Sequence, residues 1–237
     1  MSDEVRSFYD DFASRQIEQG VNLRHHKIME WLLRSGLRDG IRVLEIGCGV
    51  GTQTALIAGS IPNGKLIAND ISPKSVEHAR ERLAGRNNVE FITGDIVQLE
   101  IPGQFDLIVL PDVLEHIPVD EHGSLFLKIG RLLKPDGQVV IHIPAPQYLE
   151  WNIEHRPELL QVIDQPLHLE RLLPHVASAG LYLQFAEHYG LWTDGPDAAV
   201  LVLKHYRNDL AFKLVPPPVG RIGRWRRSFA KFRGKVK

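Results

Sequence analysis

The sequence contains few cysteines and no long apolar run. Cys48 is the single cysteine among 237 residues, so no disulfide can form within the chain and a reducing compartment is expected. No run of eighteen apolar residues occurs, so no membrane-spanning helix is predicted. The first twelve residues, MSDEVRSFYDDF, are acidic and lack the basic and then apolar layout of a secretory signal. These absences exclude a disulfide-stabilised scaffold and predict a cytoplasmic protein.

The near-neutral net charge of −1 hides an asymmetry along the chain. Residues 221–237 carry eight Lys or Arg and no acid, which leaves the remainder at about −9. A helix would gather the apolar residues of this tail on one face: Ile222, Trp225, Phe229 and Phe232. This composition predicts peripheral attachment at the inner, anionic membrane surface, with a disordered solubilising end as the alternative. Nucleic-acid binding is less favoured, because the acidic remainder would repel a phosphate backbone.

Short apolar runs alternate with segments of helical periodicity. The expected strands are Arg42–Ile46, Lys65–Ala68, Val89–Ile92, Phe105–Leu110, Gln138–Ile143, Leu181–Phe185 and Ala199–Leu203. The expected helices between the early strands are Gly51–Ser60, Pro73–Ala84 and Ser124–Leu133. Such alternation favours a parallel sheet covered on both faces. Only a short turn, Thr193 to Pro196, joins the last two strands, so this pair must be antiparallel.

Three further segments complete the expected organisation. Residues 3–19 and 22–36 read as two helices, which form an N-terminal cap over residues 1–40. The connection from Pro144 to Gly180 is long and rich in proline, and residues 144–168 of it are expected to cover an acceptor site. A domain over residues 1–207 is therefore expected, followed by a proline-containing linker, 208–220, and the basic tail.

A glycine-rich turn follows the first expected strand. The order Gly47-Cys48-Gly49-Val50-Gly51 is G-x-G-x-G, which differs from the G-x-G-x-x-G spacing of dinucleotide-binding folds. Glu45 precedes the turn, where an acid suits a ligand's ammonium group better than a pyrophosphate. Asp70 ends the second strand, 23 residues after Gly47, in position to accept hydrogen bonds from ribose hydroxyls. Asp95 follows the third strand and, with Ile96, is suited to an adenine.

The chain resembles the class I S-adenosylmethionine-dependent methyltransferases. The matching stretches are VLEIGCGVG (43–51), LIANDIS (66–72), FITGDI (91–96), FDLIVLPDVLEHI (105–117) and LLKPDGQVVIHIP (132–144). The resemblance implies a Rossmann-like, doubly wound α/β fold with a seven-stranded sheet whose last strand is antiparallel. It also implies an enzyme with S-adenosyl-L-methionine as cofactor.

The resemblance also implies which residues bind the cofactor. Gly47, Gly49 and Gly51 would surround the methionine part, Asp70 would bind the ribose, and Asp95 with Ile96 the adenine. Ile71, next to Asp70, is a further candidate for cofactor binding. Upstream, SFYDDFA resembles the segment that family members fold over the cofactor, which would place Tyr9 there. Arg24 is our candidate for the cofactor carboxylate. A core tyrosine and a solvated arginine are the alternatives.

Methyl transfer to oxygen needs a group that removes a proton, and a histidine can do so near neutral pH. His116 follows the fourth strand and His142 lies near the end of the fifth, at the sheet edge where ligands bind. Either histidine is a candidate base, although His142 could instead bond a neighbouring carbonyl group. The candidate acceptor-binding residues in the insertion are Tyr148, Trp151, His155 and His168. Tyr148 and Trp151 could equally be a helix face packed on the core.

The stretch LPDVLEHIP, 110–118, holds two carboxylates and a histidine. Asp112 and Glu115 have the spacing of a helix N-cap and its reciprocal partner, so we expect a capped turn that Pro118 ends. The alternative is a Mg²⁺ or Mn²⁺ site, since similar clusters occur in some O-methyltransferases that this segment resembles. No metal ligand is assigned.

The sequence as a whole predicts methyl transfer to a small molecule or a glycan, at oxygen. A membrane-associated acceptor, such as a lipid-linked saccharide or a quinone precursor, would fit the basic tail. The alternatives are a non-catalytic cofactor-binding module and a metal-assisted O-methyltransferase. The glycine spacing disfavours a nicotinamide dehydrogenase.

Overall fold

The structure is a computed structural model, which describes residues 20–207. The helix expected over residues 3–19, Tyr9, the linker and the basic tail lie outside the described residues. The second expected helix is present as α2, Leu23–Arg34. No helix of the described part is long and apolar enough to cross a membrane.

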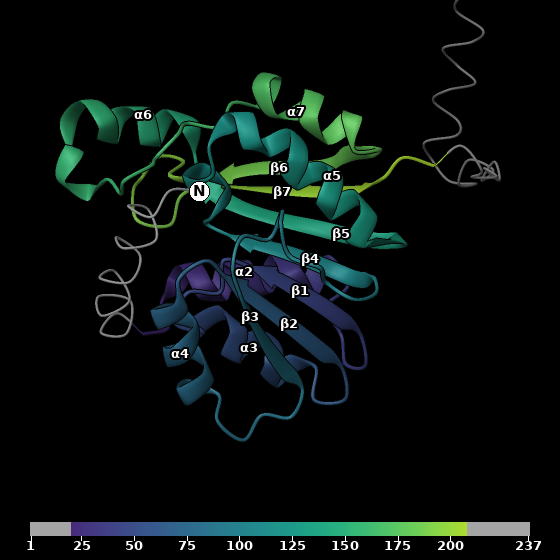
Figure 1. Cartoon of the computed structure of the whole chain (residues 1–237). Coiled ribbons are helices and arrows are strands. Elements are labelled where there is room, and N and C mark those ends of the chain that lie inside the picture. Colours follow the sequence, from purple (N-terminus) through teal and green to yellow (C-terminus); the bar gives the residue numbers. More distant parts are fainter. Residues whose placement is uncertain (1–19, 208–237) are drawn as a thin grey trace, which may run out of the picture. The chain divides into compact units, whose positions relative to one another are not determined.

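Seven strands form one mixed sheet in the order β3-β2-β1-β4-β5-β7-β6 (Figure 1). Their bounds are β1 Arg42–Ile46, β2 Lys65–Asp70, β3 Val89–Thr93, β4 Phe105–Pro111, β5 Leu133–Pro144, β6 Leu181–Tyr189 and β7 Ala198–His205. β7 lies antiparallel between β5 and β6, and the remaining pairs are parallel. The predicted fold class and the antiparallel last strand are therefore confirmed.

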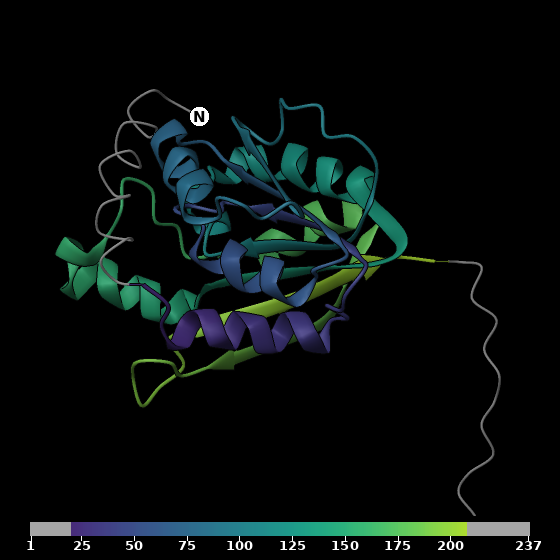
Figure 2. The ribbon, with the colours of Figure 1, turned by 90° about the horizontal axis from the view of Figure 1, so that it is seen from below.

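Helices cover both faces of the sheet, because its central strands are apolar on both sides (Figure 1, Figure 2). One face packs against α5, His122–Leu132, and α7, Leu169–Ser178. The other packs against α2, α3, Thr52–Ser60, and α4, Pro73–Arg82. Alternation along β5 decides which side each residue serves: Val139 and Ile141 face the α5 side, and Val140 faces the α2 side.

The start of α2 is held by its own sequence. Asn22 is the N-cap, and its side-chain oxygen accepts a hydrogen bond from the His25 amide. The Asn22 amide in turn donates to His25 Nδ1 at 3.2 Å. Burial lowers the pKa of His25 to about 4, so its ring is neutral and able to accept this bond. The cap fixes the first turn of α2, and with it the position of Arg24.

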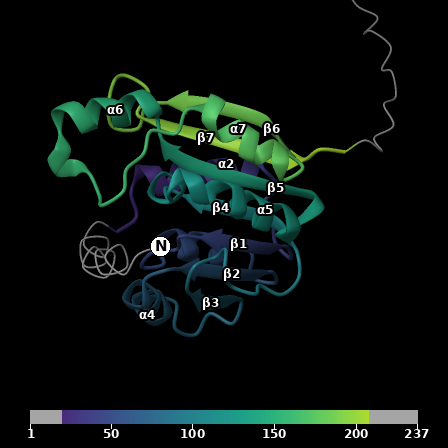
Figure 3. The ribbon, with the colours of Figure 1, turned by 45° about the horizontal axis from the view of Figure 1, so that its top comes forward.

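The carboxyl ends of the parallel strands meet at one edge of the sheet. β5 leads there into α6, Pro146–His155, which begins with proline at its first position. A one-turn helix, η3, Pro157–Leu159, and an irregular segment then lead to α7. α6 and the β6–β7 loop lie at the same end of the sheet (Figure 3). In open α/β folds this edge is where ligands bind.

We expect the core under α5 to dominate stability. Phe126 is fully buried, so Phe126→Ala removes a whole ring and leaves a cavity, which should lower the free energy of unfolding by about 3–5 kcal/mol. Its neighbour Leu127 is 44% exposed, and Leu127→Ala should cost about 0.5 kcal/mol or less. Urea denaturation of both variants measures the difference. Equal losses would show that α5 does not pack as described.

Candidate active site

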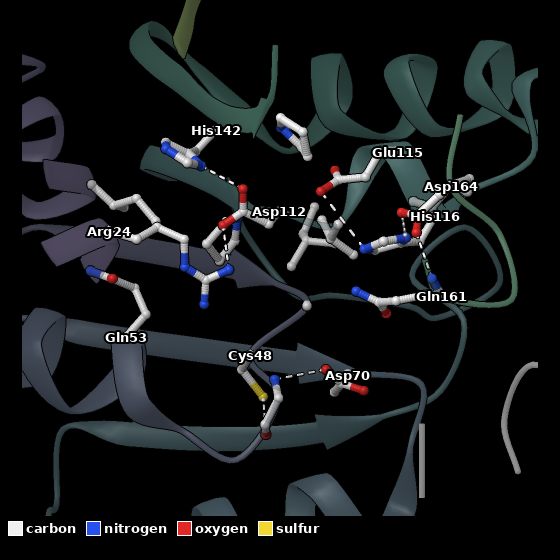
Figure 4. A pocket seen from close by; sticks show the side chains of 18 of the residues that line it. Arg24, Cys48, Gln53, Asp70, Asp112, Glu115, His116, His142, Gln161 and Asp164 are labelled. Carbon is white, nitrogen blue, oxygen red and sulfur yellow. Dashed lines mark hydrogen bonds and ion pairs between the residues drawn. The ribbon is translucent and has the colours of Figure 1, made fainter. Parts of the chain in front are cut away.

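One pocket of about 580 Å³ opens at the carboxyl edge of the sheet (Figure 4). That volume is in the usual range for small-molecule and cofactor sites. Its lining combines the loops after β1, β2, β3 and β4 with the start of α2, the insertion and the β6–β7 loop. Predicted residues among those lining it are Arg24, Gly47, Gly49, Asp70, Ile71, Asp95, Ile96, His116, His142 and Tyr148. The fold thus brings together residues that are up to 124 positions apart, from Arg24 to Tyr148.

The glycine turn is built so that its backbone borders the pocket. Gly47 has φ +81°, and a Cβ at this position would lie 2.7 Å from the Val113 side chain. Gly51 has φ +79°, and its Cβ would lie 2.9 Å from that of Ala79. Both positions therefore require glycine for conformation and for space. The backbone of Gly47 and Gly49 lines the pocket and fits a cofactor placed against the turn, whereas Gly51, although predicted to contact the cofactor, packs on α4 and does not line the pocket.

Asp70 holds the glycine turn in place. One carboxylate oxygen accepts a hydrogen bond from the Gly49 amide at 2.8 Å, and the other accepts from the Ser72 amide at 2.9 Å. A carboxylate has room for further hydrogen bonds, so Asp70 can contact a ribose while it orients the turn. Its use by the cofactor stays a prediction.

Asn69 is a residue that sequence reasoning missed. Its backbone carbonyl accepts hydrogen bonds from the Gly47 and Cys48 amides, and its side-chain amide donates to Gly94 at 2.9 Å. Asn69 therefore couples the loops after β1 and β3. The available signal was a polar residue at the end of an otherwise apolar strand.

Glu45 is placed differently from our expectation. It is fully buried and does not line the pocket. Burial raises the pKa of its carboxyl group to about 8, so it is mostly neutral near pH 7. A neutral buried acid does not provide the charge that we expected to receive an ammonium group.

On the other side of the pocket, Asp112 lies between two partners. Its Oδ1 lies 2.5 Å from His142 Nδ1, and its Oδ2 accepts a hydrogen bond from Arg24 at 2.7 Å (Figure 4). Its own amide donates to the His142 carbonyl at 2.9 Å. Burial alone would raise the pKa of Asp112, but His142 and Arg24 together lower it to about 2. Asp112 is therefore ionised at neutral pH.

The expected capping role of Asp112 and Glu115 is wrong. The turn is a one-turn helix, η1, Leu114–His116, with Val113 at its N-cap and no side-chain capping bond. Asp112 has φ +53°, a strained value for a residue with a side chain. The cause is tertiary: partners from α2 and β5 draw the carboxylate away from the turn that follows it. Glu115 is buried, with 1% of its surface exposed.

The alternative of a metal site at this stretch finds no geometric support. Among residues 20–207, no group of three or more His, Cys, Asp or Glu side chains is arranged to hold an ion. The two carboxylates of the stretch instead face different histidines, Asp112 facing His142 and Glu115 facing His116.

The two candidate bases have different surroundings. His116 Nδ1 lies 2.6 Å from the Ile163 carbonyl oxygen and 3.2 Å from Asp164 Oδ1. Burial alone would lower the pKa of His116, but Glu115 and Asp164 raise it to about 9. The imidazolium form cannot accept a proton, so His116 is a poor base at neutral pH. His142 has one nitrogen bound to Asp112, and its Nε2 has no hydrogen-bond partner among the described residues.

Of the four residues that we expected the insertion to place in the pocket, only Tyr148 lines it. Tyr148 lines the pocket, whereas Trp151 stacks on His155 with ring centroids 4.9 Å apart, and His168 pairs with Glu150 at 2.8 Å. These last three predicted residues do not line the pocket. The reason is helix phase, because α6 turns Leu149 and Asn152 inward and leaves Trp151 47% exposed.

Asn152 and several residues after α6 were missed. Asn152 is buried, borders the pocket, and its side-chain oxygen has no hydrogen-bond partner in the described part of the chain. Asn152 could have been predicted from its spacing, because it lies four residues after Tyr148 and therefore near the same face of the helix. The other missed lining residues on this side include Leu159, Leu160, Gln161, Asp164, Leu191 and Trp192.

Known proteins are similar to this chain in sequence and fold. Residues 43–137 match the family model of a methyltransferase domain. Trans-aconitate 2-methyltransferase of Methylobacterium nodulans is 29% identical over 184 residues, which are 77% of this chain and 67% of that protein. Magnesium-protoporphyrin O-methyltransferase of Synechocystis is 28% identical over 55% of this chain and 58% of its own length. Demethylmenaquinone methyltransferase of Staphylococcus aureus is 28% identical over 51% of each chain. The chain thus spans about half to two thirds of these relatives.

A solved structure has the same fold. Magnesium protoporphyrin IX methyltransferase from Synechocystis, with bound SAH, has a TM-score of 0.66 at 20% identity, covering 86% of this chain and 98% of that one. The sheet order, the glycine turn and the pocket define a Rossmann-like methyltransferase fold. Residues 43–137 thus match a methyltransferase domain, and the chain is similar in fold to a methyltransferase solved with bound SAH, in agreement with the S-adenosyl-L-methionine cofactor that the sequence predicts.

We expect Gly47→Ala to weaken cofactor binding. The new Cβ meets Val113 and forces an unfavourable φ, so the dissociation constant for S-adenosylhomocysteine should rise about tenfold or more. Gly59→Ala is the matched control, since Gly59 lies in α3 with nothing within 4 Å of its added Cβ. Isothermal titration calorimetry measures both. Parent-like affinity of Gly47→Ala would contradict the placement of the cofactor against this turn.

Proposed function

We propose that the enzyme methylates a hydroxyl group of a small-molecule acceptor, with His142 as the base. The observation that carries this proposal is the chain of contacts from Arg24 through Asp112 to His142 at the edge of the pocket. An ionised carboxylate that holds one imidazole nitrogen orients the ring and stabilises its charged form.

The residues divide the chemistry between them. When bound, S-adenosylmethionine supplies an electrophilic methyl group on sulfur. The Nδ1 proton of His142 is directed to Asp112, which leaves Nε2, a buried atom without a partner among the described residues, as the nitrogen to accept the hydroxyl proton of the acceptor. Arg24 keeps Asp112 ionised, and Asp112 stabilises the imidazolium that forms. Much of the remaining rate would come from positioning the acceptor and excluding water.

The acceptor side of the pocket suits a neutral molecule with an apolar body. Arg24 is the only Lys or Arg among the described lining residues, and it already pairs with Asp112. The charged His116 of the lining is likewise bound to Asp164, so an acceptor carboxylate or phosphate would meet acids and only cations that are already paired. Apolar contact is available from Leu149, Leu159, Leu160 and Leu191. A phenol or an apolar alcohol satisfies both conditions.

The named relatives support a small molecule rather than a macromolecule. Their names give aconitate, magnesium-protoporphyrin and demethylmenaquinone as acceptors. A membrane-associated acceptor, such as a quinone precursor or a lipid-linked saccharide, rests only on the sequence of residues 221–237. A glycan acceptor has no separate support in the pocket.

The proposal predicts base-dependent turnover. His142→Gln and Asp112→Asn should each lower kcat by about 10²-fold or more, because the first removes the base and the second its charged partner. His155→Gln is the control, since His155 is exposed and stacks on Trp151 away from the pocket. Production of S-adenosylhomocysteine is measured with panels of phenols, alcohols, sugars and amines.

Two outcomes would contradict the proposal. Turnover of amines alone, with His142→Gln as active as the parent, would show that no base acts on a hydroxyl. No turnover with any panel, despite tight S-adenosylhomocysteine binding, would favour a non-catalytic cofactor-binding module. Calorimetry with S-adenosylhomocysteine shows whether each variant keeps its pocket.

A further inference from the structure

The insertion is attached to the turn after β4 through one buried histidine. We propose that His116 is a positioning residue, a charged clamp that fixes residues 157–165 as the outer wall of the acceptor site. This segment, the clamp segment, contains η3 and the irregular chain after it. The inference rests on the proposed function only in treating this side of the pocket as the acceptor side.

The contacts of His116 define its tautomer. Nδ1 faces two acceptors, the Ile163 carbonyl oxygen at 2.6 Å and Asp164 Oδ1 at 3.2 Å, so Nδ1 must carry a proton. Figure 4 shows His116 beside Asp164. The His116 side chain is 8% exposed, and the Asp164 side chain is 9% exposed. Buried ion pairs of this kind are costly to break from one side, because the remaining charge loses its partner.

Asp164 connects His116 to the clamp segment. Its second oxygen, Oδ2, accepts a hydrogen bond from the backbone N–H of Gln161 at 2.5 Å. One carboxylate therefore closes the turn from Gln161 to Asp164 and binds His116 at once. Loss of the histidine would loosen both the anchor and the turn.

Two neutral hydrogen bonds lie beside the clamp. The Gln165 amide donates to the Glu115 carbonyl at 3.1 Å, and its side chain donates to the Ile117 carbonyl at 2.9 Å. These bonds attach the end of the segment to the same turn. These two hydrogen bonds do not depend on charge. They would keep Gln165 attached to the turn after His116 is replaced, while the preceding residues of the clamp segment would lose their contact with it.

The held segment forms one wall of the pocket. Leu159, Leu160, Gln161 and Asp164 all line it. The segment has a single one-turn helix of its own and little regular structure, so its order depends on such contacts. His116 thereby sets the shape of the space that the acceptor enters, without being required to touch it.

The charged groups around His116 decide its pH dependence. Glu115 Oε1, on the same turn, lies 3.7 Å from Nε2, Asp164 comes from the insertion, and Asp112 stands at the end of β4. Burial raises the pKa of Glu115 to about 8, so the carboxylates that face the ring at neutral pH are mainly those of Asp164 and Asp112, with Arg24 bound to the far side of Asp112. The pKa of His116 rises to about 9, above its ordinary 6.5. The charged part of the clamp is therefore complete below about pH 6.5 and is lost as pH rises through about 9, whereas a neutral ring can still donate its Nδ1 hydrogen bond.

Hydrogen–deuterium exchange on the enzyme loaded with S-adenosylhomocysteine tests the clamp without a known acceptor. At pH 7, peptides covering residues 157–166 should exchange about tenfold faster in His116→Ala than in the parent. His116→Asn, whose amide can replace the Nδ1 donor without charge, should be intermediate. His168→Asn is the matched control, because His168 pairs with Glu150 outside the pocket.

The pH series compares each enzyme with the control at the same pH, so intrinsic exchange rates cancel. The difference between parent and His116→Asn should disappear as pH rises from 7 to 10, because only the parent loses a charge. If His116→Ala does not fold, Asp164→Asn carries the same expectation of faster exchange at pH 7. Exchange that matches the control in the folded variants would overturn the clamp.

Kinetics with a phenol from the turnover panel separate positioning from chemistry. His116→Asn should raise KM for that phenol about tenfold and leave kcat within about threefold. S-adenosylhomocysteine affinity should not change. A loss of kcat at unchanged KM would instead place His116 in the reaction and overturn the clamp. The His142 variants and the acceptor panel test the proposed function. The exchange experiment uses no acceptor, so it tests the clamp independently of that function.

Discussion

The site depends on a single carboxylate held between two cationic or proton-donating partners. Asp112 follows a buried strand, and in that position an unpaired negative charge would be prohibitively costly. Arg24 from α2 and His142 from β5 remove that cost. The same contacts bring α2, β4 and β5 together beside the pocket. The strained backbone of Asp112, at φ +53°, is tolerated because these partners determine where its side chain must lie.

Two histidines at one sheet edge have opposite electrostatic settings. His142 meets one carboxylate, which is shared with Arg24, and keeps a nitrogen without a partner. His116 meets Asp164 and a carbonyl oxygen on one nitrogen and Glu115 near the other. The surroundings of His142 suit a ring that accepts and releases a proton, whereas those of His116 suit a ring that keeps its proton. We infer that a chemical role and a structural role are thus divided between side chains that looked equivalent in the sequence.

The fold and the loops that border one half of the pocket were largely predictable, whereas the use of these loops by the cofactor stays a prediction. Apolar strands, the glycine turn and acids at strand ends are local features, and each strand ends within a few residues of the next glycine, acid or proline. The acceptor half was not predictable to the same degree. Tyr148 lines the pocket, but Trp151 turns outward, because α6 buries Asn152 and the adjacent residue of a helix lies about 100° away from it. Asp112 was mistaken for a cap because its partners lie 88 and 30 positions away.

The sequence by itself determined the sheet, its antiparallel last pair and the glycine turn with Asp70 beside it. These follow from apolar periodicity, from turn length and from backbone freedom, which act over a few neighbouring residues. Only the tertiary structure decided that Glu45 is buried away from the pocket, that His116 is charged, and that Asp112 faces Arg24 and His142. Burial and the distance between charges depend on chain segments far apart in sequence, so no local pattern specifies them.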